Sequence, residues 1–167
     1  MKIQEFHDKK TGTLSYIVFD QESLDAIIID PVLDYNLDDK KVSHESFNNL
    51  ITFIKNHKLN PLLILETHVH ADHLSCSQLL KGTFPQAKTA INSNVSAVQS
   101  TFKKELSLDS NFNTDGRQFD ILLNDGQNLT VGTLNIKVIF TPGHTPACTS
   151  FLIGENLFTG DALFMPD

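Results

Sequence analysis

Short apolar runs, each bounded by turn residues, recur along most of this chain and predict strands. Some runs alternate apolar and polar positions, as a half-buried strand does, and others are continuously apolar, as a fully buried strand is. The predicted strands are 2–7, 13–19, 26–29, 62–66, 88–91, 120–123, 128–131, 134–140, 149–153 and 156–159. The last two are expected to form a hairpin that turns at Gly154 and Glu155.

Helices are predicted where apolar residues recur every three or four positions. In residues 44–57 the apolar side chains are Phe47, Leu50, Ile51 and Ile54. Their spacing places them on one face of an amphipathic helix. Ser43 stands just before this segment and is predicted to be its N-cap. Further helices are predicted at about 72–81 and 94–106, and polar loops at 34–43 and 109–120.

Length and composition predict one globular domain covering residues 1–167, without repeats or linkers. Hydrophobic residues make up 40% of the chain, which is ordinary for a packed core. The formal net charge is -7 and no run of basic residues is longer than a pair, which argues against nucleic-acid partners and anionic membrane surfaces. No apolar run is long enough to span a bilayer. The start lacks a secretory signal, so the expected location is the cytoplasm.

The chain has two widely spaced cysteines, Cys76 and Cys148. In a cytosolic protein such cysteines are expected to be reduced thiols rather than a disulfide. Cys148 follows His144 by four residues, so its thiol could line a substrate pocket. The favoured interpretation is a small buried residue that packs a strand.

The densest set of metal-binding side chains is His68-Val69-His70-Ala71-Asp72-His73, directly after a predicted strand. Imidazole and carboxylate groups are common protein ligands of zinc and non-haem iron. Two histidines at i and i+2 point the same way if the backbone is still extended. The alternative is a solvated histidine-rich turn. His7, His44 and His57 lack such neighbours and are not expected to bind metal.

Two later turns each add one potential ligand at the end of a predicted strand. Residues 141–145 (TPGHT) follow the strand 134–140 and present His144. Residues 159–162 (TGDA) follow the strand 156–159 and present Asp161. A single Gly-Asp pair is usually only a turn. Together, three strand ends carrying His or Asp predict a metal centre at one rim of a sheet.

These motifs resemble the metallo-β-lactamase superfamily, whose signature is His-x-His-x-Asp-His, then a Gly-His turn, then a later Asp. Within that superfamily, four segments are similar to persulfide dioxygenases (sulfur dioxygenases), which are related to glyoxalase II. The segments are 30–35, 66–75, 143–148 and 160–167. The resemblance implies an α/β (α+β) fold, an αβ/βα sandwich built from two similar halves. The superfamily domain is usually longer, so the second half is expected to be incomplete in this chain.

Carried over position by position, the resemblance implies that one iron(II), Fe²⁺, is bound by His68, His144 and Asp161. Such a site leaves coordination positions open. His70 is a further candidate metal ligand, and Asp72 and His73 are assigned supporting catalytic roles or a second metal site. Asp30 is either an acid near the metal rim or a turn-forming residue before Pro31.

Three functions follow as hypotheses. The favoured one is an iron-dependent dioxygenase that uses O2 to oxidise glutathione persulfide, or a similar small persulfide, to sulfite and thiol. The alternative is a hydrolase of glyoxalase II type that cleaves thioesters with two zinc ions, Zn²⁺, bridged by Asp161. The third is an inactive remnant or interaction protein, for which an unpaired sheet edge predicts self-association as a homo-oligomer.

Overall fold

The computed structural model describes residues 1–36, 38, 40–70 and 74–164. The chain forms two compact units, each made of several separate stretches of sequence. The first consists of Met1–Leu65, His70–Thr89 and Val131–Leu134. The second consists of Glu66–Val69, Ala90–Thr130 and Asn135–Asp167. Because both units draw on several separate stretches of sequence, no simple boundary divides the chain, and the single-domain assignment stays a prediction.

The first unit contains a sheet in the order β1 (Lys2–His7), β2 (Leu14–Phe19), β3 (Asp25–Ile29) and β7 (Asn60–Leu65). Its neighbours are antiparallel except β3 and β7, which are parallel. A parallel pair needs a long crossover connection, and α1 (Glu45–Asn56) lies within it. The four strands confirm the predicted ones to within two residues at each end. The segment predicted as a loop at 34–43 also contains the short hairpin of β5 (Tyr35–Asn36) and β6 (Lys41–Val42).

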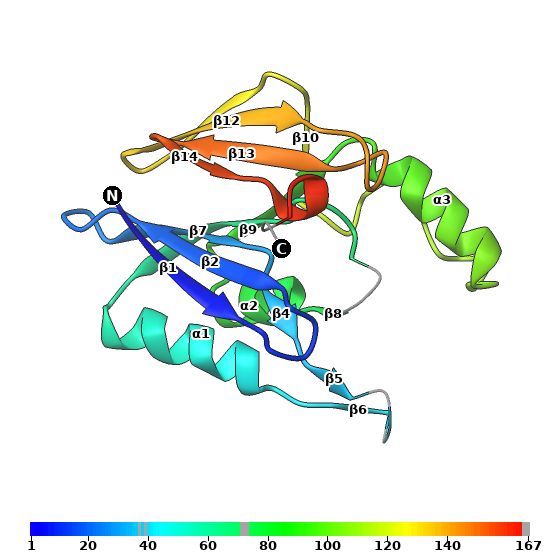
Figure 1. Ribbon diagram of the computed structural model, residues 1–167, viewed down its shortest axis with the longest axis horizontal. Coiled ribbons are helices and arrows are strands. Elements are labelled where there is room, and N and C mark those ends of the chain that lie inside the picture. The colour runs from blue at the N-terminus through cyan, green and yellow to red at the C-terminus, as the bar shows by residue number, and fades with distance from the viewer. Residues whose placement is uncertain (37, 39, 71–73, 165–167) are drawn as a thin grey trace. The chain divides into compact units, whose positions relative to one another are not determined.

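The core of the first unit lies between this sheet and two helices, α1 and α2 (Ser77–Thr83), which cover the same face of it (Figure 1). The predicted apolar face of α1 is confirmed, because Leu50, Ile51 and Ile54 are buried in this cluster and Phe47 packs against it. The other buried members are Ile17, Ala26, Ile28, Leu59, Ile64, Cys76, Leu80 and Ala87. Burying each of the Leu and Ile side chains in this cluster contributes about 1.5–3 kcal/mol.

The N-terminus of α1 differs from its prediction. The N-cap residue is His44 rather than Ser43, and among the described residues its side chain makes no capping hydrogen bond. A residue from an earlier turn replaces the cap: the Asp34 carboxylate accepts hydrogen bonds from the Ser46 backbone N–H at 2.9 Å and the Ser46 hydroxyl at 2.8 Å. Asp34 is buried, and a buried charge is costly unless it is hydrogen-bonded. The two donors on Ser46 compensate the charge of its carboxylate. The prediction of Ser43 was wrong because the cap comes from a distant residue.

We expect Asp34→Ala to lower the free energy of unfolding by about 1–2 kcal/mol, the usual cost of losing an N-cap. Ser43→Ala, the matched control, should change it by less than about 0.5 kcal/mol, as exposed substitutions do. Urea denaturation followed by circular dichroism measures both. Equal effects of the two variants would show that Asp34 does not cap the helix.

The start of α2 is a second correction. The helix predicted from about residue 72 begins at Ser77, and Leu74–Ser75 form strand β8. This strand pairs with β4 (Val32–Leu33) in antiparallel register. The Ser75 hydroxyl then accepts a hydrogen bond from the Ser77 backbone N–H at 3.1 Å. Pairing with a strand remote in sequence therefore delays the helix, and a local apolar pattern does not reveal such pairing.

The second unit contains a parallel strand pair and an antiparallel sheet. Residues of β9 (Lys88–Asn92) pair with β10 (Ile121–Leu123), and α3 (Val95–Glu105) lies in the connection. The sheet has the order β11 (Asn128–Val131), β12 (Leu134–Phe140), β13 (Thr149–Ile153) and β14 (Asn156–Phe158), followed by the short helix η1 (Gly160–Ala162). These bounds confirm the predicted strands and the helix at 94–106 to within about one residue at each end.

The helices of the described ranges are all too short or too polar to cross a membrane. The expected absence of membrane and nucleic-acid partners and the expected cytoplasmic location stay predictions.

Candidate metal centre

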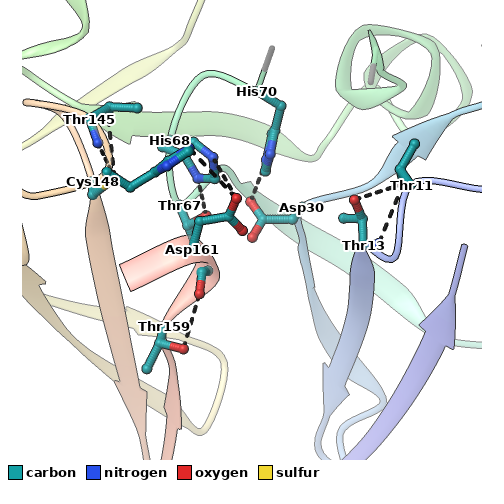
Figure 2. Close-up of polar contacts among 12 residues, drawn as sticks. Thr11, Thr13, Asp30, Thr67, His68, His70, Thr145, Cys148, Thr159 and Asp161 are labelled. Carbon is teal, nitrogen blue, oxygen red and sulfur yellow. Dashed lines mark hydrogen bonds and ion pairs between the residues drawn. The ribbon is translucent and has the colours of Figure 1, made fainter. Parts of the chain in front are cut away.

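Three side chains predicted to bind a metal come together in the second unit. His68 lies in the segment 66–69 after β7, His144 in the turn between β12 and β13, and Asp161 in η1. Each follows a strand end along the chain, as the sequence predicts. One nitrogen or oxygen from each side chain lies within 4.8 Å of the other two (Figure 2 labels His68 and Asp161).

The donor set fits a metal ion in chemistry, and two of its three separations match binding to one ion. His68 Nε2 lies 3.9 Å and His144 Nε2 lies 3.6 Å from Asp161 Oδ2. Zinc binds imidazole nitrogen and carboxylate oxygen at about 2.0–2.2 Å, so two donors on one ion lie at most roughly 4 Å apart. The two imidazole rings are 5.0 Å apart between centroids and nearly perpendicular, at 87°. Their ligand role stays a prediction that this geometry permits.

Exposure differs across the three side chains. The side chain of His68 is 1% exposed, whereas those of Asp161 and His144 are 36% and 45% exposed. His68 is therefore fixed inside the protein, and the other two face solvent in part. Partial exposure of His144 and Asp161 is what a catalytic site with open coordination positions requires.

Two contacts of Thr67 hold this centre, and the sequence analysis assigned that residue no role. Its hydroxyl lies 2.9 Å from His68 Nδ1, and its backbone carbonyl accepts a hydrogen bond from the Thr149 N–H at 2.8 Å (Figure 2 labels Thr67). Gly160, next to Asp161, has a φ of +49°. A Cβ there would collide with the Thr67 hydroxyl, so only glycine permits this approach.

The turn that carries His144 is braced by Cys148. Its sulfur accepts a hydrogen bond from the Thr145 backbone N–H at 3.1 Å, and the Thr145 hydroxyl lies at the same distance (Figure 2). The Thr141 N–H also donates to the Cys148 carbonyl at 3.0 Å. Both cysteines are reduced thiols and both are buried, as the interpretation of Cys148 as a packing residue requires. The sequence offers only one hint of this contact, the spacing of three residues between Thr145 and Cys148.

His70 has a defined partner in the first unit. Its Nε2 lies 3.4 Å from Asp30 Oδ1, and both side chains are 5% exposed. Asp30 also forms the turn after β3, with a φ of +47°, and its carbonyl accepts a hydrogen bond from the Ser15 hydroxyl at 2.6 Å. The pKa of Tyr16 is raised, mainly by burial and to a smaller extent by the negative charges of Asp30 and Glu5. Asp30 is thus a turn residue, one of the two alternatives that the sequence left open, and its role as an acid near the metal rim stays a prediction.

Asp72 and His73, the residues assigned catalytic roles, lie outside the described residues. Their roles, and the second metal site that would use them, stay predictions. The same holds for His70 as a metal ligand.

Comparison with known proteins agrees with the resemblance of the motifs. A family model described as the metallo-β-lactamase superfamily matches residues 10–167. "Glyoxylase B2" of Dictyostelium discoideum is 45% identical over 167 residues, which cover 99% of this chain and 57% of that protein. The human "Persulfide dioxygenase ETHE1, mitochondrial" is 28% identical over 165 residues, which cover 98% of this chain and 53% of that protein.

Among solved structures, that of ETHE1 from Myxococcus xanthus superimposes with a TM-score of 0.74 at 28% identity. The match covers 99% of this chain and 59% of the other. The chain thus spans little more than half the length of these relatives.

Proposed function

The chain belongs to the metallo-β-lactamase superfamily, and on that premise we propose that it supplies the metal-binding residues of a thioester hydrolase of glyoxalase II type. Its α/β fold is that of the superfamily and is partial relative to its relatives, as the sequence predicts. The substrate class in this proposal is a small thiol ester such as a thioester of glutathione.

The observation that carries the proposal is the 45% identity with "Glyoxylase B2", against 28% with the human persulfide dioxygenase, over nearly the same residues. Function depends on the site rather than on the fold, and the higher identity over the same stretch of chain supports the reaction of the more similar relative. The comparisons therefore favour the hydrolase over the dioxygenase that the motifs favoured.

In this proposal His68, His144 and Asp161 hold the metal. A bound metal ion polarises a carbonyl and lowers the pKa of a bound water. The protein contributes the placement: the buried His68 fixes one side of the site, and the partly exposed His144 and Asp161 leave the other open to the substrate. A second ion would need further ligands, for which Asp72 and His73 are the sequence candidates.

The second candidate is the iron-dependent persulfide dioxygenase. Two imidazoles and one carboxylate form the donor set found in many non-haem iron(II) oxygenases, and these three groups gather in one unit. In this case the substrates are a small persulfide and O2, and the activity requires redox chemistry that only the metal supplies. The motif resemblance and the 28% identity with ETHE1 support it.

Metal content and substrate choice together distinguish the candidates. The protein is purified without added metal and analysed for elements. It is then assayed with a glutathione thioester and, separately, for oxygen uptake with glutathione persulfide. The hydrolase proposal expects about two zinc ions per chain and thioester cleavage that a chelator abolishes and zinc restores.

About one iron per chain with persulfide-dependent oxygen uptake would replace the hydrolase by the dioxygenase. Protein that holds no metal and acts on neither substrate would contradict both. It would leave the third hypothesis, an inactive or interaction protein, for which self-association in analytical ultracentrifugation is the expected sign.

A further inference from the structure

Thr67 stands between two of the three residues that gather at the metal centre. It precedes His68 in the chain, and its side chain packs against Gly160, the neighbour of Asp161. Thr67 is itself buried, with 1% of its surface exposed. A hydroxyl in such a place is costly unless it is hydrogen-bonded, so its position needs a physical reason.

The first reason is the ring of His68. Its Nε2 is the atom on the side of Asp161, at 3.9 Å from Oδ2, and its Nδ1 is the atom beside the Thr67 hydroxyl, at 2.9 Å. A histidine that binds metal through one nitrogen carries its proton on the other, and that N–H needs an acceptor. With Nε2 on the metal, Nδ1–H donates to Thr67 Oγ1. The contact therefore holds the orientation of the ring and, with Nε2 on the metal, gives the Nδ1–H its acceptor.

The second reason is the approach of η1. The Cα of Gly160 lies so close to Thr67 that an added Cβ would collide with the Thr67 Oγ1 and would come within 2.7 Å of the Thr67 Cβ. The β-branched side chain of Thr67 thus limits how near the Asp161 turn can come. The Thr67 carbonyl, which accepts from Thr149 N–H at the start of β13, fixes the segment from which both contacts are made.

From these contacts we propose that Thr67 is a positioning residue for metal binding: its hydroxyl orients the ring of His68 and, as the atom nearest to Gly160, limits how close the Asp161 turn can come. The inference rests on the proposed function only in requiring that the centre bind a metal. It does not depend on which of the two reactions follows.

Thr67→Val and Thr67→Ser separate the effect of the hydroxyl from that of the branched shape. Valine keeps the branched shape and removes the oxygen, whereas serine keeps the oxygen and removes the methyl. We expect Thr67→Val to raise the zinc dissociation constant about 10–100-fold, the usual effect of losing the partner of a ligating histidine. Thr67→Ser should bind zinc nearly as the wild type does. Competition with a chromophoric chelator measures the affinities.

A spectroscopic readout tests orientation apart from affinity. In the zinc-loaded wild type, a hydrogen-bonded His68 Nδ1–H proton should resonate downfield in NMR spectra. Thr67→Ser should keep this shift, and Thr67→Val should lose it. The control is Thr101→Val in α3, which removes a threonine hydroxyl that donates to the Ala97 carbonyl on an exposed surface. This control should change neither the zinc affinity nor the His68 resonance.

Circular dichroism verifies that each variant folds. If Thr67→Val does not fold, Thr67→Ala, which also lacks the oxygen, replaces it in the test. Wild-type zinc affinity and an unchanged His68 proton in the hydroxyl-free variant would overturn the positioning role while leaving the metal centre intact. A wild-type chain that binds no zinc would instead overturn the metal centre and this inference with it.

Discussion

His144→Ala is expected to weaken metal binding at least about 100-fold, because the loss of a ligand should cost no less than the loss of a ligand's hydrogen-bond partner. His144 supplies one of the two imidazoles of the centre, and its Nε2 lies 3.6 Å from Asp161 Oδ2. Its side chain is 45% exposed, so the substitution removes little buried surface and should leave stability nearly unchanged. Elemental analysis of protein purified without added metal, followed by zinc titration, measures the effect.

His44→Ala is the matched control, since His44 is an exposed histidine at the start of α1 and outside the ligand groups of the described residues. It should retain wild-type metal content. Metal content that survives in His144→Ala would remove this histidine from the ligand set. The predicted centre would then need a different third donor.

Phe151→Ala is expected to lower the free energy of unfolding by about 3–5 kcal/mol, the cost of a large cavity in a packed core. Phe151 is fully buried in β13, and it pairs directly with Val138 of β12 and Phe158 of β14. Directly opposite residues lie on the same face of a sheet, so the three side chains form one apolar layer. Such a loss approaches the entire stability of many domains.

Leu152→Ala serves as the control for this prediction. Leu152 is the next residue of β13, so its side chain points to the opposite face, where it pairs with Leu157, which is 52% exposed. Its loss should cost clearly less than that of Phe151. Urea denaturation measures the free energy of unfolding of both variants. It is followed by far-UV circular dichroism, because the chain contains no Trp for fluorescence. Equal destabilisation by the two variants would show that the burial of Phe151 does not decide the stability of β13.

Elements with a strong local pattern were predictable. The apolar period of Phe47, Leu50, Ile51 and Ile54 predicts α1, and its buried face is confirmed. The alternating pattern of 134–140 predicts β12, which has the same bounds in the structure. Both patterns work because the period of the backbone decides which side chains share a face, and this period is a local property.

The corrections share one cause, which is contact between residues far apart in the sequence. The cap of α1 comes from Asp34 rather than from Ser43, because a folded turn brings that carboxylate to Ser46. Likewise α2 begins at Ser77 because β8 first pairs with β4. Neither partner lies within the window of residues over which a helix signal is read.

The sequence by itself determined the kinds of side chain at the candidate centre and their places at strand ends. His68, His144 and Asp161 were named from motif spacing and resemblance, because metal chemistry restricts the ligands to a few residue types. The tertiary structure alone decided that the three meet within one unit, that His68 is buried while the other two are partly exposed, and that Thr67 and Gly160 hold them. The physical reason is that distance, burial and close approach depend on how separate strands pack, and no local pattern encodes that packing.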